Sequence, residues 1–218
     1  MKILLFLLIP LLIFSQNESI KKMKMLPKIE FDKAFNDSIV TLKSLDLWNF
    51  ILSSKESGIN LNDYNANFII RLENAKWANE IHFLIKLLIE QNTEKIIIEN
   101  VLNNKSQIWD KGEWSEKFWL LIRENNFSIL KNYYFDINEK GEKKYNIKLF
   151  FDEKIKNNEI GVNPLLKLNY SITDYPENQI LKILEKLNIK DIQIISKENS
   201  ILLFGKRGID GMIQVLTK

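Results

Sequence analysis

The fold class is decided by residues 132–151, whose sequence is NYYFDINEKGEKKYNIKLFF. Apolar and polar side chains alternate with a period of two on both sides of a polar turn at residues 139–142. This alternation is typical of two antiparallel strands that share one apolar face. We expect Phe135 and Phe151 to lie on that face. An apolar sheet face needs a cover, and helices are the usual one.

Three segments before this hairpin have the apolar spacing of amphipathic helices: residues 42–57, 74–91 and 110–123. In the last of them, Asp110 and Glu113 have the spacing of a capping box, which predicts a helix start there. The short apolar runs at 67–72 and 94–101 instead predict strands. The N-terminal region is therefore expected to be an α+β domain, with helices packed on a small antiparallel sheet.

The first fifteen residues have the pattern of a secretory signal. Lys2 is followed by the apolar run from Ile3 to Phe14, interrupted by Pro10, and Ser15 closes the run. A basic start, a short apolar core and a small final residue are the features of such signals. This core would span about 18 Å as a helix, less than the ~30 Å of a bilayer interior. We therefore expect residues 1–15 to be removed and the exported protein to have no membrane span.

Residues 162–218 are expected to form a second, smaller α+β module after a domain of residues 16–161. The dipeptide Asn163–Pro164 marks its start. The expected elements are a strand pair around residues 169–170, a helix after residue 176, a strand at 189–195, a turn-like segment at 199–204 and a strand at 211–216.

Gly205, Gly208 and Gly211 recur at every third position and enclose Lys206 and Arg207. Glycines in such places supply a positive φ or a close approach of two backbones. We expect the glycines to shape a structural turn and consider the two cations candidate contact residues for a partner. The alternative is that the turn only closes the sheet.

Motifs of the module occur in a particular order: NPLL at 163–166, LNIKDIQII at 187–195 and LFGKRGIDGMI at 203–213. This order resembles the C-terminal half of the plug domain of TonB-dependent outer-membrane receptors of the Bacteroidetes type. Phe204 stands where that family usually has Tyr, and Asp210 where it usually has Asn. The resemblance covers about a quarter of the chain. It implies an interaction module of the cell envelope without catalytic residues, and since no residues remain for a barrel we expect no transporter.

Composition excludes several classes of function. The chain has no cysteine, which excludes thiol catalysis and Cys-ligated metals. Its 31 basic and 28 acidic side chains give a net charge of +3, too little to indicate nucleic-acid binding. The basic cluster Lys21, Lys22 and Lys24 is expected to be a solvated leader, with a weak contact to an anionic surface as the alternative.

Catalytic motifs are sparse. His82 is the sole imidazole and is expected at the rim of a core, so no catalytic residue, metal site or cofactor is predicted. We expect a non-enzymatic protein, periplasmic or associated with the outer membrane, with an envelope protein as its possible partner. Secretion is the alternative location.

A secreted hydrolase is the alternative function, with a carboxylate site in the N-terminal domain. The candidate pairs are Asp152 with Glu153 and Asp136 with Glu139. Trp109, expected in a loop, is its candidate for ligand contact.

Overall fold

The computed structural model describes residues 19–218, which form a mixed α+β fold with helices in the N-terminal part and strands later. The chain divides into two compact units, one ending at Ile108 and the other beginning at Trp109. The expected signal at residues 1–15 lies outside the described residues. Within residues 19–218, no helix combines the length and apolar composition that crossing a bilayer requires.

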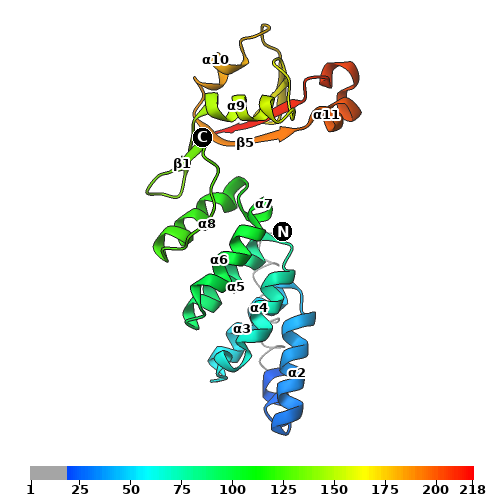
Figure 1. The fold of residues 1–218 in the computed structure, drawn as a ribbon. Helices are drawn as coiled ribbons and strands as arrows, with labels where there is room; N and C mark the ends of the chain where they lie inside the picture. The colour runs from blue at the N-terminus through cyan, green and yellow to red at the C-terminus, as the bar shows by residue number, and fades with distance from the viewer. Residues whose placement is uncertain (1–18) are drawn as a thin grey trace, which may run out of the picture. The chain divides into compact units, whose positions relative to one another are not determined.

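The described part of the first unit is helical (Figure 1). Its helices are α2 (Lys28–Thr41), α3 (Ser44–Glu56), the 3₁₀ turn η1 (Leu61–Tyr64), α4 (Asn65–Asn74), α5 (Ala78–Glu90) and α6 (Lys95–Asn104), and the boundary to the second unit falls inside α7 (Ser106–Trp109). The helices expected at 42–57 and 74–91 are therefore confirmed as α3 and α5.

The strands expected at 67–72 and 94–101 are wrong, because these residues lie in α4 and α6. A short apolar run does not by its periodicity distinguish a buried strand from a helix. In α6 the buried residues are Ile98, Val101 and Leu102, the i, i+3, i+4 spacing of a helix, whereas Ile96 is exposed. The helices of this unit consequently pack on one another and not on a sheet.

The core of the first unit also holds the chain before α2. Ile20 is fully buried, and residues 19–23 are helical. Lys24 Nζ donates a hydrogen bond to the carbonyl oxygen of Ser57 at 2.8 Å. Lys21, Lys22 and Lys24 are exposed as expected, but their segment is not a free leader, because the buried side chain of Ile20 attaches it to the core.

The first whole elements of the second unit are α8 (Gly112–Glu124) and a hairpin of β1 (Phe135–Ile137) and β2 (Lys143–Tyr145). Phe135 pairs with Tyr145 in antiparallel register, which confirms the hairpin over a shorter range than expected. Phe135 is buried, and its ring centroid lies 5.9 Å from that of Trp119 on α8. A helix therefore does cover this apolar face.

The second half of the expected hairpin is helix α9 (Ile147–Lys156). Asn146 ends the strand because its side chain accepts a hydrogen bond from the Leu149 amide at 3.1 Å and caps the helix. Phe151 is buried as expected, but it projects from a helix and not from a paired strand.

A four-stranded sheet follows, in the order β4–β3–β6–β5. Its elements are β3 (Leu165–Leu168), β4 (Ser171–Thr173), α10 (Ile180–Leu184), β5 (Ile189–Ile195), α11 (Lys197–Phe204), the 3₁₀ turn η2 (Gly205–Gly208) and β6 (Met212–Thr217). The β3–β6 pair is parallel, and the other pairs are antiparallel. These strands agree with the expected ones, whereas the turn-like segment expected at 199–204 is a helix.

The expected boundary after residue 161 does not separate the two compact units. Ile147, Phe150 and Ile160 belong to the same buried cluster as Leu166 and Ile213 of the sheet. Helix α9 and the C-terminal strands therefore share one core, within the unit that begins at Trp109.

Candidate functional site

The backbone geometry of the turn favours glycine at each of the three positions. Gly205 and Gly211 have φ of 61° and 80°, values that other residues rarely adopt. Gly208 instead lies against α11, where a Cβ atom would be 2.3 Å from the carbonyl oxygen of Ser200. Helix α11 and η2 therefore pack backbone to backbone at this point.

Lys206 and Arg207 lie exposed in η2, between the glycines. Arg207 Nη2 is 3.3 Å from Asp174 Oδ1, but both side chains are mostly solvent-exposed. An exposed pair of this kind is worth little, because water screens it and ordering two side chains costs entropy. The geometry thus leaves the guanidinium accessible to another anion.

The C-terminal half of helix α11 is apolar on its exposed side. Ser200 is fully buried, whereas Ile201, Leu202 and Leu203 are 44, 83 and 64% exposed. At 100° per residue, Leu202 lies nearly opposite Ser200, with Ile201 and Leu203 on either side of it. Ile209, just after η2, is 65% exposed. We call residues 201–209 the α11–η2 tip.

The apolar half of this tip was not predicted from the sequence. Residues 199–204 were expected to be turn-like, and only Lys206 and Arg207 were candidate contact residues. The signal was nevertheless present, since Ile201, Leu202 and Leu203 directly precede the two cations. Aliphatic residues next to a glycine turn do not by themselves show whether they are covered.

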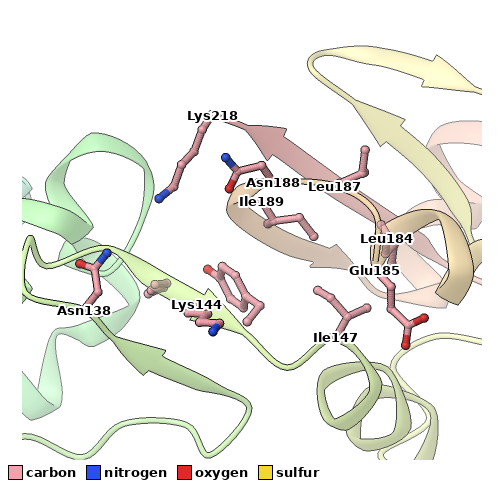
Figure 2. A pocket seen from close by; sticks show the side chains of 11 residues that line it. Asn138, Lys144, Ile147, Leu184, Glu185, Leu187, Asn188, Ile189 and Lys218 are labelled. Atoms are coloured by element: carbon pink, nitrogen blue, oxygen red, sulfur yellow. The ribbon is translucent and has the colours of Figure 1, made fainter.

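A cavity of about 390 Å³ lies elsewhere in the second unit (Figure 2). Its lining comes from the hairpin, the start of α9 and the segments around α10, β5 and the end of β6: Asn138, Lys143, Lys144, Tyr145, Ile147, Leu184, Glu185, Leu187, Asn188, Ile189 and Lys218.

Two of the lysines of this cavity are paired. Lys143 Nζ lies 2.8 Å from Asp110 Oδ1, and Lys218 Nζ lies 2.9 Å from Glu142 Oε2. The hydrogen bond from Lys218, together with one from Asn138, lowers the pKa of Glu142. Neighbouring carboxylates thus offset most of the positive charge of the cavity, which gives it little preference for anions.

Asp110 does not cap α8 in the expected way. The N-cap is Lys111, and Asp110 Oδ1 instead accepts hydrogen bonds from Ser115 Oγ and Trp119 Nε1, both at 2.7 Å. With its ion pair to Lys143, this carboxylate connects α8 to the hairpin. Its environment is that of a structural carboxylate whose acceptor oxygen is already in use.

Trp109, the expected ligand-contact residue of a hydrolase, is fully buried. Its ring centroid lies 5.1 Å from that of Phe118 and 5.3 Å from that of Trp119. This expectation is wrong, because the residue is the last of helix α7 and packs inward. A fully buried ring cannot provide a contact surface for a ligand.

The carboxylate pairs also differ from expectation. Asp136 accepts a hydrogen bond from Lys131 Nζ at 2.8 Å, which lowers its pKa, whereas a general acid needs a raised one. Asp152 and Glu153 lie on helix α9 and not on a strand. Within residues 19–218, no three His, Asp or Glu side chains gather closely enough to hold a metal ion. His82 is half-buried on α5.

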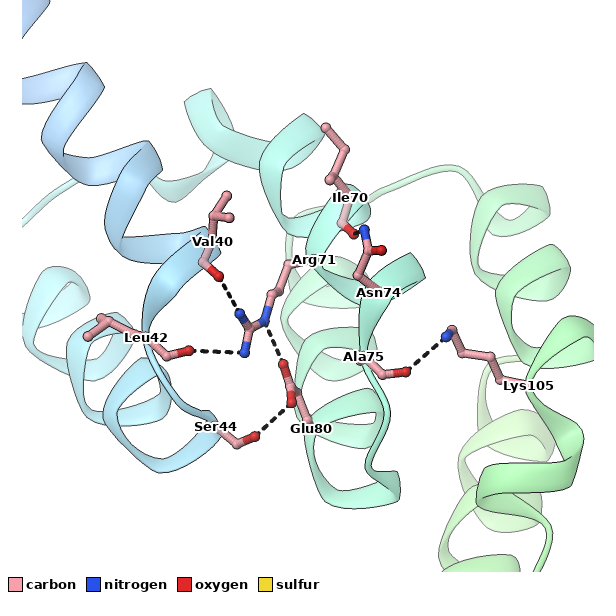
Figure 3. Close-up of polar contacts among 9 residues, drawn as sticks. All are labelled: Val40, Leu42, Ser44, Ile70, Arg71, Asn74, Ala75, Glu80 and Lys105. Atoms are coloured by element: carbon pink, nitrogen blue, oxygen red, sulfur yellow. Dashed lines mark hydrogen bonds and ion pairs between the residues drawn. The ribbon is translucent and has the colours of Figure 1, made fainter.

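In the first unit, Arg71 and Glu80 form the centre of a polar network (Figure 3). Arg71 donates hydrogen bonds to the carbonyl oxygens of Val40 and Leu42, at the end of α2. Ser44 Oγ donates to the second oxygen of Glu80 at 2.7 Å. The network satisfies carbonyls that a helix end leaves free, which is a structural role.

An open cavity of about 270 Å³ adjoins this network. Ile70 and Trp77, which contribute to its wall, are 52 and 67% exposed. Since the Arg71 guanidinium is engaged by Glu80 and two carbonyls, the cavity offers mainly an apolar rim.

No protein-family model, curated protein or solved structure matches this chain. The resemblance to a receptor plug therefore depends on the motifs of residues 162–218 alone. The site that combines those motifs with an unusual surface is the α11–η2 tip.

Proposed function

We propose that the chain is an exported, non-enzymatic protein of the cell envelope that binds a partner through its C-terminal module. The observation that carries this proposal is the aliphatic outer face of α11 beside Lys206 and Arg207. Exposed apolar surface costs roughly 25 cal/mol per Å² relative to burial, so contiguous patches of it mark interaction sites. The export pattern of residues 1–15 and the resemblance to a receptor plug support an envelope location.

Two features of the tip support binding rather than a purely structural turn. The glycines account for the backbone geometry, but neither of the two cations is required by it. The only described partner of Arg207 is Asp174, through a solvent-exposed ion pair. The side chains of the tip are consequently available without rearrangement of the fold.

The test is crosslinking combined with fractionation in the native host. A photoreactive residue at Leu202 should capture an envelope component, protein or lipid, and the chain should fractionate with the periplasm or outer membrane. The same residue at Lys148, exposed on α9, is the matched control and should capture much less. An intact Met1–Ser15 segment on cytoplasmic protein, or equal capture from both positions, would contradict the proposal.

A further inference from the structure

Helix α11 has an inverted distribution of polarity. A helix on the surface of a globular unit normally turns its apolar residues inward. Here the fully buried residue is Ser200, whose Oγ has no hydrogen-bond partner within the described chain, and Phe204 one turn later is half-buried, whereas Ile201, Leu202 and Leu203 face outward. Two features therefore lower the stability of the second unit: a buried hydroxyl without a hydrogen-bond partner and an exposed aliphatic surface.

The close contact with Gly208 explains why the inward residue is small. The backbone of η2 approaches α11 so closely that a Cβ on Gly208 would collide with the carbonyl of Ser200. No leucine fits at such a contact, so the aliphatic residues of α11 remain outside. Hydrogen bonds then hold the base of the tip, from the Asn163 amide to Asp210 Oδ2 at 2.9 Å and from the Gly211 amide to the Gly208 carbonyl at 2.9 Å.

The charges of the tip indicate which class of partner it binds. Residues 201–209 contain Lys206 and Arg207 and no carboxylate, so the tip combines aliphatic and cationic groups, and the exposed Glu198 lies one helical turn before it. Arg207 can exchange its exposed Asp174 partner for a phosphate oxygen, to which a guanidinium binds well. This combination complements a surface with phosphates outside and hydrocarbon beneath.

The type of apolar residue in the tip favours a lipid partner over a protein partner. The centres of protein interfaces are enriched in Trp, Tyr and Arg, and leucine is under-represented among their energetic hot spots. The strongly exposed apolar residues of the tip are aliphatic: Ile201, Leu202, Leu203 and Ile209. Aliphatic residues next to Lys and Arg are typical of segments that bind the boundary between headgroups and acyl chains.

We propose that the α11–η2 tip docks on an anionic phospholipid bilayer. Leu202, Leu203 and Ile209 enter the acyl boundary, and Lys206 and Arg207 contact the lipid phosphates. In Figure 1, α11 projects beyond the end of β5, so within the second unit no other labelled element lies outside it. This inference depends on the proposed function, because it names the partner of the same surface.

The experiment is vesicle flotation with the protein as it is purified from expressing cells. Vesicles of phosphatidylcholine mixed with phosphatidylglycerol are compared with vesicles of phosphatidylcholine alone. The wild-type protein should float with the anionic vesicles and lose most of this binding in high salt, which screens exposed charges.

Substitutions then separate the two contributions. Leu202→Ser should weaken partitioning about tenfold or more, as expected for one lost buried leucine. Lys206→Gln with Arg207→Gln should weaken it about 25-fold, since each cation near an anionic surface contributes about fivefold. Leu130→Ser, at an 85% exposed leucine of the same unit, and Lys148→Gln are the matched controls and should bind like wild type.

Three results would overturn the inference. One is a wild-type protein that stays unbound, and another is an equal loss of binding in Leu130→Ser. The third is a dimer in sedimentation that Leu202→Ser dissociates, because a second copy would then cover the tip. Crosslinks from position 202 to an envelope protein, without lipid binding, would refute the lipid partner and leave the proposed function standing.

Discussion

Helices α5 and α11 have similar aliphatic residues but place them in opposite surroundings. In α5, Leu84 and Leu88 are completely buried, whereas in α11 Leu202 and Leu203 are mostly exposed. Both helices have consecutive aliphatic residues in the sequence, so composition does not separate them. Consecutive aliphatic residues therefore predict an apolar helix face. Whether that face lies in the core or remains exposed depends on which other segments of the chain pack against it.

The buried polar residues of the two helices differ in the same way. Glu80 of α5 is 5% exposed, but Arg71 and Ser44 bind its two oxygens. Ser200 of α11 is fully buried, and within the described residues its hydroxyl has no hydrogen-bond partner. A buried polar group is tolerated at low cost only when it is paired. Glu80 therefore stabilises its unit, whereas Ser200 is a compromise imposed by close packing.

The largest expected effect comes from removing Glu80, the buried polar residue that has hydrogen-bond partners. Glu80→Ala leaves the Arg71 guanidinium without its carboxylate and should cost about 3–5 kcal/mol of unfolding free energy in the first unit. Urea denaturation, with hydrogen exchange of α5 to locate the effect, measures it. Glu90→Ala, at an exposed ion pair of the same helix, should cost less than about 1 kcal/mol. Equal effects at the two positions would show that the network contributes nothing.

The next effect compares the two helices directly. Leu84→Ala should destabilise the first unit by about 2–5 kcal/mol, because it leaves a cavity in a close-packed core. Leu202→Ala should change the unfolding free energy of the second unit by less than about 0.5 kcal/mol, as an exposed substitution. Chemical denaturation of both variants tests this. A large loss from Leu202→Ala would mean that the outer face of α11 is covered within the protein.

A smaller effect is expected at the close backbone contact between Gly208 and Ser200. Gly208→Ala should cost about 1–3 kcal/mol, because the new Cβ overlaps the Ser200 carbonyl and α11 or η2 must shift. Thermal denaturation and faster hydrogen exchange in α11 report it. The φ of this residue is not in the left-handed region, so the expected effect is a steric clash and not backbone strain. An unchanged melting temperature would contradict the backbone contact.

The smallest effect should have the opposite sign. Ser200→Ala removes a buried hydroxyl without a partner and should stabilise the second unit by about 1 kcal/mol. Ser115→Ala is the matched control, because its Oγ donates to Asp110 at 2.7 Å and its removal should cost about 1 kcal/mol. Denaturant midpoints measure both variants. Equal losses in the two would mean that Ser200 has a partner.

Prediction from the sequence succeeded where a periodic pattern was long or a strand was bounded by turns. Helix α5 and strand β5 were both expected close to their observed ranges. Residues 94–101 and 147–151 were assigned to strands and are helical. Runs of β-branched and aromatic residues have only a weak preference for strands, which tertiary packing overrides.

The candidate site was predicted only in part. Lys206, Arg207 and the glycines were identified from their spacing, but the aliphatic face of α11 was not. Trp109 was placed in a loop and is a core residue of a helix end. Periodicity locates the apolar residues of a segment, but it does not say what lies beside them.

The sequence by itself determined the α+β class, the hairpin at 135–145, the strands of the C-terminal sheet and the positions of the glycine turn. These features depend on local alternation, on turn residues and on backbone freedom, all of which are properties of neighbouring residues. Only the tertiary structure decided that α9 joins the C-terminal core, that Trp109 is buried and that α11 turns Leu202 outward. The physical reason is that burial depends on contacts between segments far apart in the chain, such as the approach of Gly208 to Ser200.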